Sequence, residues 1–335
     1  MAEMNRKIKI PPASAAAQNR MPNTLIQMTP ARSIGAMLPF TAADSEFFII
    51  TIRCRERKRG QPVILGSSLV GSRTIYGGND MFTRAIVRRP CKAMRDGIST
   101  AGLGLPDYEL AYRQHANYVT ALEECGLAVT VLPAEEAYPD GTFVEDTAVM
   151  LPSGVILTRP GAASRRGEVE RMRPTLESLF NKVSIIESPG TLEGGDVLMV
   201  GSHFYIGISE RTNQDGAQQM IGILEQYGLT GCMVHLKEML HLKSGVSYLE
   251  RGNLLVYGEF VANPIFSNFT KLRVDHSEAY ASNSLWINDT VLVPQSCPMT
   301  ALTIKAKGYV VKSLDVSEFQ KLDGGLSCLS LRFSD

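Results

Sequence analysis

Short apolar runs alternate with longer amphipathic segments from about residue 81 to the end of the sequence. The short runs are rich in Val, Ile and Leu, which is typical of buried strands. We predict strands at residues 84–87, 128–132, 147–157, 183–186, 197–208, 233–236, 254–256, 272–274, 285–293 and 309–311. Strands that alternate with helical segments indicate an α/β fold.

The segments between these strands show apolar residues at helical spacing. We predict helices at residues 108–125, 168–180, 217–227 and 299–307. Gly126, Gly228 and Gly308 follow three of them, where a glycine in the left-handed conformation ends a helix.

Three of the strand segments are long enough to fold back as hairpins. Their turns are predicted at residues 152–154, 201–202 and 288–289, where Gly, Ser, Asn and Asp interrupt the apolar pattern. Hairpins indicate sheets with both antiparallel and parallel neighbours. The unit of strand, helix and hairpin recurs about every fifty residues, which predicts repeated modules around a centre.

Residues 1–80 lack this periodicity, and only residues 47–52 form a candidate strand. This part holds 11 basic and 5 acidic side chains. We expect a disordered basic leader over residues 1–80, followed by a catalytic domain over residues 81–335. Two alternatives stay open for the leader, which are organelle targeting and RNA binding through the basic run 53–59. Met81 could equally begin the folded chain.

Composition excludes several classes of function. The chain of 335 residues is 44% apolar and 20% charged, as in globular proteins. No apolar run is long enough to cross a membrane, so we expect no membrane partner. Residues 81–335 keep 23 basic against 29 acidic side chains, which gives no reason to expect nucleic acid as a partner. The six cysteines are scattered singly, which favours a reducing compartment and a cytoplasmic location.

Candidate chemistry begins with a loop at residues 139–147 that leads into a predicted strand. It carries Asp140, Glu145 and Asp146, of which at least one is expected to reach the interior. A buried carboxylate needs a partner, and a guanidinium is a natural one because it can be held by two hydrogen bonds. The alternative is a solvated turn with an aspartate cap.

Three further positions stand out. Glu193 precedes Gly194-Gly195 at the entrance of a strand, which indicates either a close backbone approach or a bulge. His241 lies between two leucines, where it is either a functional or a structural histidine. Cys328 follows a Gly-Gly turn near the chain end and is a candidate nucleophile. Together these residues are the inventory of a cysteine-dependent hydrolase that attacks an amidine-like carbon.

Seven segments in this order are familiar as a set: MFTRAIVRRP (81–90), PDGTFVEDTAV (139–149), RPGAASRRGE (159–168), GTLEGGDVLMV (190–200), HFYIGISERTN (203–213), LHLKSG (240–245) and DGGLSCLSLRF (323–333). Through them, residues 81–333 closely resemble the dimethylarginine dimethylaminohydrolase family. That family belongs to the guanidino-group-modifying superfamily, together with arginine deiminase and the amidinotransferases.

The resemblance implies a fold and an activity. The fold would be a five-bladed, pseudo-symmetric α/β propeller of ββαβ modules, with the active site in the central channel. The activity would be hydrolysis of Nω,Nω-dimethyl-L-arginine and Nω-monomethyl-L-arginine to L-citrulline and dimethylamine or methylamine, through a thiouronium intermediate on a cysteine. No metal or other cofactor is implied. The partner is a small-molecule substrate, and a homodimer is common in the family.

The resemblance also implies roles for individual residues. The catalytic residues would be Cys328 as nucleophile, His241 as general acid and base, and Glu193 as the accompanying acid. The substrate-binding residues would be Asp146 at the guanidinium, Glu145 beside it in the substrate wall, Asp140 at the α-amino group, Arg165 and Arg211 at the α-carboxylate, and Ile98 and Leu322 through backbone carbonyls. Phe143 is suited by its chemistry to pack on the methyl groups.

Two other functions remain as alternatives. An arginine deiminase-like hydrolase would use the same cysteine, histidine and acids on another guanidino substrate. A non-catalytic binding protein on the same scaffold would have no need of Cys328, His241 and Glu193 together.

Overall fold

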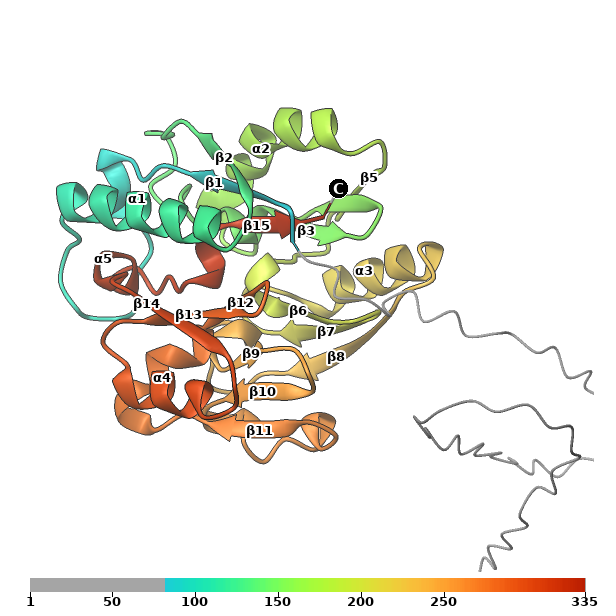
Figure 1. Cartoon of the computed structure of the whole chain (residues 1–335). Coiled ribbons are helices and arrows are strands. Elements are labelled where there is room, and N and C mark those ends of the chain that lie inside the picture. Colours follow the sequence, from blue (N-terminus) through green and yellow to red (C-terminus); the bar gives the residue numbers. More distant parts are fainter. Residues whose placement is uncertain (1–81, 335) are drawn as a thin grey trace, which may run out of the picture. The chain divides into compact units, whose positions relative to one another are not determined.

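The computed structural model describes residues 82–334, which belong to one compact unit (Figure 1). The leader predicted over residues 1–80, the candidate strand 47–52 and Met81 lie outside the described residues. No helix in residues 82–334 combines the length and apolar character that a membrane crossing needs.

The strands form five sheets of three strands each, in the orders β15-β1-β2, β3-β4-β5, β6-β7-β8, β11-β10-β9 and β12-β13-β14. Their bounds are β1 (Arg84–Arg88), β2 (Ala128–Leu132), β3 (Ala148–Leu151), β4 (Gly154–Leu157), β5 (Val183–Ile185), β6 (Val197–Val200), β7 (His203–Ile208), β8 (Thr230–His235), β9 (Val246–Tyr248), β10 (Asn253–Val256), β11 (Thr270–Arg273), β12 (Leu285–Ile287), β13 (Thr290–Pro294), β14 (Val310–Leu314) and β15 (Leu331–Phe333). In every sheet the central strand pairs antiparallel with one neighbour and parallel with the other.

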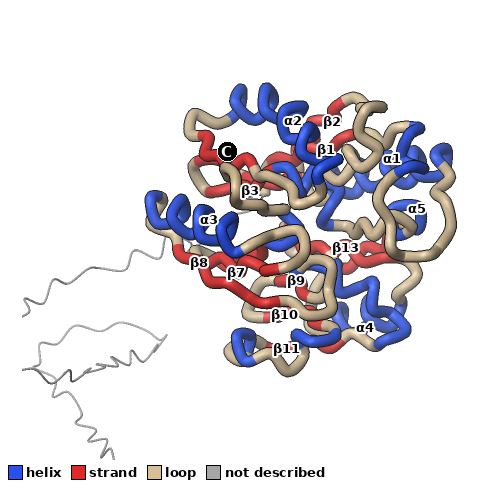
Figure 2. The backbone as a smooth tube through the Cα atoms, turned by 180° about the vertical axis from the view of Figure 1, so that it is seen from behind, coloured by secondary structure: helices blue, strands red, loops and turns tan. Residues whose placement is uncertain are grey.

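Each parallel pair is joined by a crossover, because two parallel strands cannot be linked by a tight turn. Helices make four of the crossovers: α1 (Tyr108–Glu124), α2 (Arg166–Leu179), α3 (Gln214–Gln226) and α4 (Pro298–Lys305). In the fourth sheet two short 3-10 turns, η6 (Gly258–Phe260) and η7 (Pro264–Phe266), take the place of the helix. Figure 2 shows α2, α3 and α4 on different sheets. The predicted α/β fold with five repeated modules is therefore confirmed.

The first module contains the last strand of the chain. β15 pairs antiparallel with β1, so that Arg84 lies opposite Phe333 (Figure 1). The module at the start of the described chain is thus completed by its end. Cys328 comes shortly before β15, and this strand pairing fixes the position of the segment that carries it.

The sequence prediction was close for four helices and most strands, but it missed three features. Neither β9 nor the short helix α5 (Ser317–Gln320) was predicted, and β8 begins at Thr230 instead of residue 233. The first residues of β8 are Thr, Gly and Cys, which give no apolar pattern, and they are strand because they pair with β7. Gly126, Gly228 and Gly308 have φ of 92°, 70° and 84°, which confirms the predicted helix ends.

Five short 3-10 turns stand directly before the first strands of the five modules. They are η2 (Val144–Thr147) before β3, η4 (Gly194–Asp196) before β6, η5 (Leu242–Ser244) before β9, η8 (His276–Asn283) before β12 and η9 (Ser327–Leu329) before β15. η2 contacts η4 and η9, η4 contacts η5, and η5 contacts η8. One equivalent segment from each module therefore meets its neighbours, and these turns carry most of the polar residues described next.

Candidate active site

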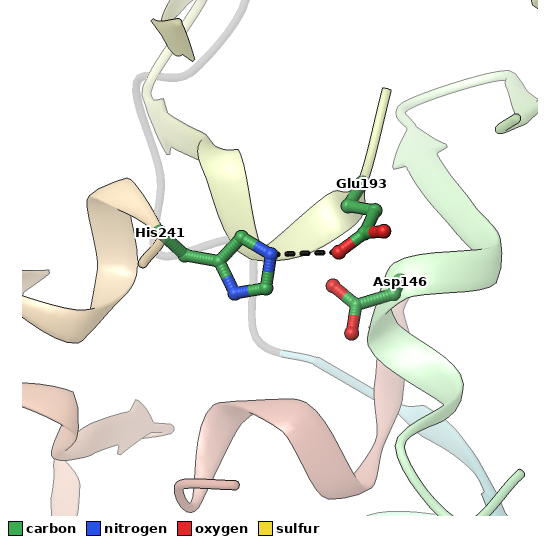
Figure 3. Close-up of side chains that lie close together, drawn as sticks. All are labelled: Asp146, Glu193 and His241. Carbon is green, nitrogen blue, oxygen red and sulfur yellow. Dashed lines mark hydrogen bonds and ion pairs between the residues drawn. The ribbon is translucent and has the colours of Figure 1, made fainter. Parts of the chain in front are cut away.

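The three residues predicted to be catalytic lie on three of these turns. Glu193 is the residue before η4, His241 is the residue before η5, and Cys328 lies within η9. Nε2 of His241 and Oε2 of Glu193 are 2.8 Å apart (Figure 3). Cys328 and His241 together line two adjoining cavities. The structure thus brings together three residues that are far apart in the sequence.

Asp146 completes this cluster from η2 (Figure 3). Its Oδ1 accepts a hydrogen bond of 2.8 Å from the amide of Gly195. A Cβ at Gly195 would lie 2.8 Å from Nδ1 of His241. Gly195 therefore has no room for a side chain, and the close backbone approach expected from the two glycines is an approach to the imidazole.

Buried carboxylates keep His241 protonated. Burial by itself lowers the pKa of His241, but the charges of Asp196, Glu193 and Asp146 outweigh it and raise the pKa to about 9. Asp196 is fully buried, and its carboxylate accepts hydrogen bonds from the amide of Leu242 at 2.9 Å and from Oγ of Ser209 at 2.7 Å. At neutral pH His241 is therefore an imidazolium that can act as an acid.

The thiol of Cys328 is protonated at neutral pH. Burial raises its pKa to about 12, with further contributions from the negative charges of Glu145 and Asp146, while Lys243 acts in the opposite direction. Sγ accepts a hydrogen bond of 3.3 Å from the amide of Gly325. A cationic ligand beside the sulfur would offset the two carboxylates and favour the thiolate.

Glu145 lines neither of the two cavities that contain Cys328. Its carboxylate lies behind the nucleophile loop instead, 2.7 Å from Nζ of Lys243, 2.7 Å from Oγ of Ser327 and 3.2 Å from Nη2 of Arg332. The side chain of Asn283 connects the same parts, because it donates to the carbonyl of Lys243 and accepts from the amide of Ser327. Glu145 is therefore held in a network with the segment that carries Cys328, and its place in the substrate wall stays a prediction.

This network predicts opposite effects on the thiol from its two charged members. We expect Glu145→Gln to lower the pKa of Cys328 and Lys243→Met to raise it, each by about one unit, because each change removes one nearby charge. The measurement is a pH titration of thiolate ultraviolet absorbance in each variant, with the trace of the same variant carrying Cys328→Ser subtracted. Shifts of the same sign in both variants would contradict this electrostatic account.

The other predicted binding residues line the first cavity, together with Asp146 and Glu193. They are Ile98, Asp140, Phe143, Arg165, Arg211 and Leu322. Asp140 is buried, which raises its pKa, and it accepts a hydrogen bond of 3.1 Å from the amide of Ile98. Nη1 of Arg211 lies 4.0 Å from Oε1 of Glu193. Four acids and two arginines thus line this cavity: Asp140, Asp146, Glu193, Asp323, Arg165 and Arg211.

Arg165 is buried and almost fully engaged. Nη1 lies 2.6 Å from Oδ2 of Asp146, and Nε and Nη2 donate to Glu168 at 3.1 and 2.8 Å. Nη2 also donates to the carbonyl of Phe143 at 2.9 Å. Burial opposes the ionisation of Asp146, but Arg165 and His241 overcome it and hold the pKa of Asp146 below its usual value.

A second cavity adjoins the first one at the nucleophile. It shares Cys328, His241 and Asp323 with the first cavity and is otherwise lined by Gly195, Lys243, Ser244, Tyr280, Asn283 and Gly325. Sequence reasoning assigned no role to these residues. Lys243 and Asp323 stand within two of the segments that carried the resemblance, whereas Tyr280 and Asn283 lie in a 3-10 turn without any sequence signal.

The cluster of His241, Glu193 and Asp146 is also the arrangement in which a metal ion could be held. One nitrogen or oxygen of each residue lies within 4.8 Å of the others. Carboxylates at this spacing suit an organic cation equally well, because a guanidinium is held by paired carboxylate oxygens. That the reaction needs no metal stays a prediction.

Comparisons with known proteins point to one family. The family model described as "N,N dimethylarginine dimethylhydrolase, eukaryotic" matches residues 107–244. The chain is 48% identical over 254 residues to the N(G),N(G)-dimethylarginine dimethylaminohydrolase of Pseudomonas aeruginosa, covering 76% of this chain and all of that protein. A crystal structure of a cysteine-to-serine variant of the Pseudomonas enzyme with citrulline matches with a TM-score of 0.75, again over 76% of this chain and all of that one. A histidine-to-glycine variant of dimethylarginine dimethylaminohydrolase, described as an adduct with S-methyl-L-thiocitrulline, matches with the same identity, coverage and TM-score.

Proposed function

This chain belongs to the dimethylarginine dimethylaminohydrolase family, and from that premise we propose that it hydrolyses Nω,Nω-dimethyl-L-arginine and Nω-monomethyl-L-arginine. The products are L-citrulline and dimethylamine or methylamine. The observation that carries the proposal is the position of Cys328, which lies beside His241 between two cavities. The first of these cavities has the charges that an arginine derivative requires.

Each charged group of a methylated arginine has a residue of opposite charge in the first cavity. Asp140 receives the α-ammonium group, and Arg211 with Arg165 receives the α-carboxylate. Asp146 and Glu193 hold the guanidinium beside Cys328. Phe143 lines this cavity and not the second one, so its ring faces the carbon chain of the substrate in this assignment. The side chains of Asp140 and Asp146 are both buried, so their charges act on the substrate with little screening.

The first half-reaction forms a covalent intermediate. The guanidinium adds a positive charge beside Cys328, which lowers the pKa of the thiol, so that the thiol proton is released to solvent and the thiolate remains. The thiolate attacks the guanidinium carbon, which Asp146 and Glu193 keep in place. His241, held as imidazolium by the surrounding carboxylates, protonates the departing amine. An S-alkylthiouronium on Cys328 and a neutral His241 remain.

The second half-reaction is hydrolysis. Neutral His241 takes a proton from a water molecule, and the hydroxide so formed attacks the thiouronium carbon. The C–S bond then breaks, and the proton of the new hydroxyl group passes to the departing sulfur, which releases neutral L-citrulline and regenerates the thiol of Cys328. His241 has regained its proton, and the carboxylates around it again stabilise the charged form.

The second cavity is where the proposal places the leaving amine. Cys328 and His241 line it, whereas Asp140, Arg165 and Arg211, which are assigned to the amino-acid end, line only the first cavity. Tyr280 has a fixed position there, because its hydroxyl donates a hydrogen bond of 2.7 Å to the carbonyl of Gly324. The selectivity between methylated and unmethylated guanidinium groups therefore depends on Tyr280, Asn283 and Ser244 more than on Phe143.

The test is product release from three substrates in parallel: asymmetric dimethylarginine, symmetric dimethylarginine and arginine. Release of citrulline and dimethylamine from the asymmetric substrate alone is the expected result. Turnover of arginine would favour the deiminase-like alternative. Tight binding of a substrate without any turnover would favour the non-catalytic binding protein.

Partners and location complete the proposal. The partner is a small-molecule substrate, without nucleic acid or membrane, and a homodimer is the expected assembly. Cysteines 91, 125, 232, 297 and 328 are all unpaired within the described residues. Unpaired thiols are typical of a reducing compartment, which supports the cytoplasm as the location.

A further inference from the structure

Glu168 is a buried carboxylate in the first turn of α2 that has no role in the site as predicted from the sequence. Only 4% of the residue is exposed. Its Oε1 accepts from Nε of Arg165 at 3.1 Å, and its Oε2 accepts from Nη2 at 2.8 Å. Two carboxylates therefore grip the same guanidinium, Glu168 on one edge and Asp146 on the other.

We propose that Glu168 is a positioning residue that fixes Arg165 so that one N–H remains for the α-carboxylate of the substrate. The inference rests on the proposed function, because the α-carboxylate of an amino-acid substrate is the ligand of Arg165.

Counting the donors of Arg165 leads to this role. A guanidinium side chain has five N–H groups in one plane. Glu168 takes the one on Nε and one on Nη2, and Asp146 takes one on Nη1. The second N–H on Nη2 is shared by the backbone carbonyls of Phe143 at 2.9 Å and Asp140 at 3.4 Å. One N–H on Nη1 is left among the described contacts, on a residue that lines the first cavity. Because the group is planar, fixing Nε and Nη2 also fixes the direction of that last N–H.

The charged groups facing Glu168 come from several elements. They are Arg165 from the turn before α2, Asp140 and Asp146 from the segment around η2, and Arg88 from β1. Burial raises the pKa of Glu168 to about 7, against the opposing effect of Arg165. His241 has a pKa of about 9, and the pKa of Asp146 lies below its usual value. Glu168 therefore changes its charge near neutral pH, whereas those two do not.

This geometry predicts an effect on KM. Above about pH 7 Glu168 is anionic and holds Arg165 by two charge-assisted hydrogen bonds. Below about pH 7 its carboxyl group is protonated and holds Arg165 more weakly. KM for the substrate therefore rises as the pH falls. Glu168→Gln is permanently neutral. We expect it to raise KM for dimethylarginine about 10-fold at pH 8 and to make KM nearly independent of pH between about pH 6 and pH 8. Turnover should change less than about threefold, because Glu168 contacts none of Cys328, His241 and Glu193.

The experiment measures kcat and KM across this pH range for the wild type, Glu168→Gln, Glu168→Asp and Glu170→Gln. Glu168→Asp keeps the charge and should restore part of the pH dependence. Glu170→Gln is the matched control, because Glu170 lies on the same helix with an exposed side chain paired to Arg173 and should behave as wild type.

The outcomes separate this inference from the proposed function. Wild-type kinetics in Glu168→Gln, even with a lowered melting temperature, would show a merely structural role and overturn the inference. If Glu168→Gln does not fold, the wild-type profile decides, since a KM that stays constant between about pH 6 and pH 8 overturns the inference too. A wild-type protein without turnover overturns the proposed function and the inference with it.

Discussion

Replacing Cys328 by serine is expected to lower the turnover of Nω,Nω-dimethyl-L-arginine by at least about 10⁴-fold. Attack on the guanidinium carbon needs an anionic nucleophile. The substrate guanidinium can lower the pKa of a thiol enough for it to ionise near neutral pH, but not the much higher pKa of an alcohol. Substrate binding should survive, because the charged residues of the first cavity are unchanged. The measurement is citrulline release under saturating substrate, together with binding of dimethylarginine by calorimetry.

The matched control is Cys232→Ser. Cys232 is a half-buried cysteine on β8 and lines neither cavity, so this variant should keep wild-type turnover. Mass spectrometry of the quenched wild-type reaction should show the covalent intermediate, which must be absent from Cys328→Ser. Substantial turnover in Cys328→Ser would refute the proposed mechanism.

Replacing His241 by glycine is expected to lower turnover of dimethylarginine about 10³- to 10⁴-fold, because both half-reactions lose their proton-transfer group. The two steps can be separated with S-methyl-L-thiocitrulline. Its leaving group is a thiol, which departs without the strong acid that an amine requires. The first step should therefore proceed in His241→Gly, while the second, which needs a base, should stall. Intact-protein mass spectrometry should show an adduct that accumulates on Cys328.

The control for this prediction is His235→Ala, at the exposed end of β8. It should turn over both substrates at wild-type rates and accumulate no adduct. If His241→Gly hydrolysed S-methyl-L-thiocitrulline to citrulline as fast as the wild type, His241 would not be the base of the second step.

Local patterns accounted for most of the secondary structure. The helix at Tyr108–Glu124 and the hairpin of β3 and β4 were predicted because their apolar spacing is complete within each segment. The strand β9 and the start of β8 were not predicted. β9 has only three residues, too few for a periodic pattern, and β8 begins with Thr, Gly and Cys. Both are strand through backbone pairing with their neighbours.

Local patterns also identified candidate catalytic residues, but not the side chains that contact them in the folded protein. Cys328, His241 and Glu193 each had a second, structural interpretation when taken singly. Glu145 is predicted to lie in the substrate wall, and the folded chain adds that its carboxylate accepts hydrogen bonds from Lys243 and Ser327. The spacing of residues along the sequence cannot reveal such a contact, because its members come from three different modules.

The class of fold, the repeating module and the residue types available for the chemistry follow from the amino-acid sequence, since each of these depends on short segments or on residue identity. Which groups face one another, and hence their charge states, follows from the folded chain alone. Three carboxylates hold His241 as an imidazolium, burial keeps the thiol of Cys328 protonated, and Arg165 pairs with both Asp146 and Glu168. The reason is physical, because the pKa of a buried group depends on the charges within a few ångströms of it, and here those charges are brought together by turns that begin separate modules.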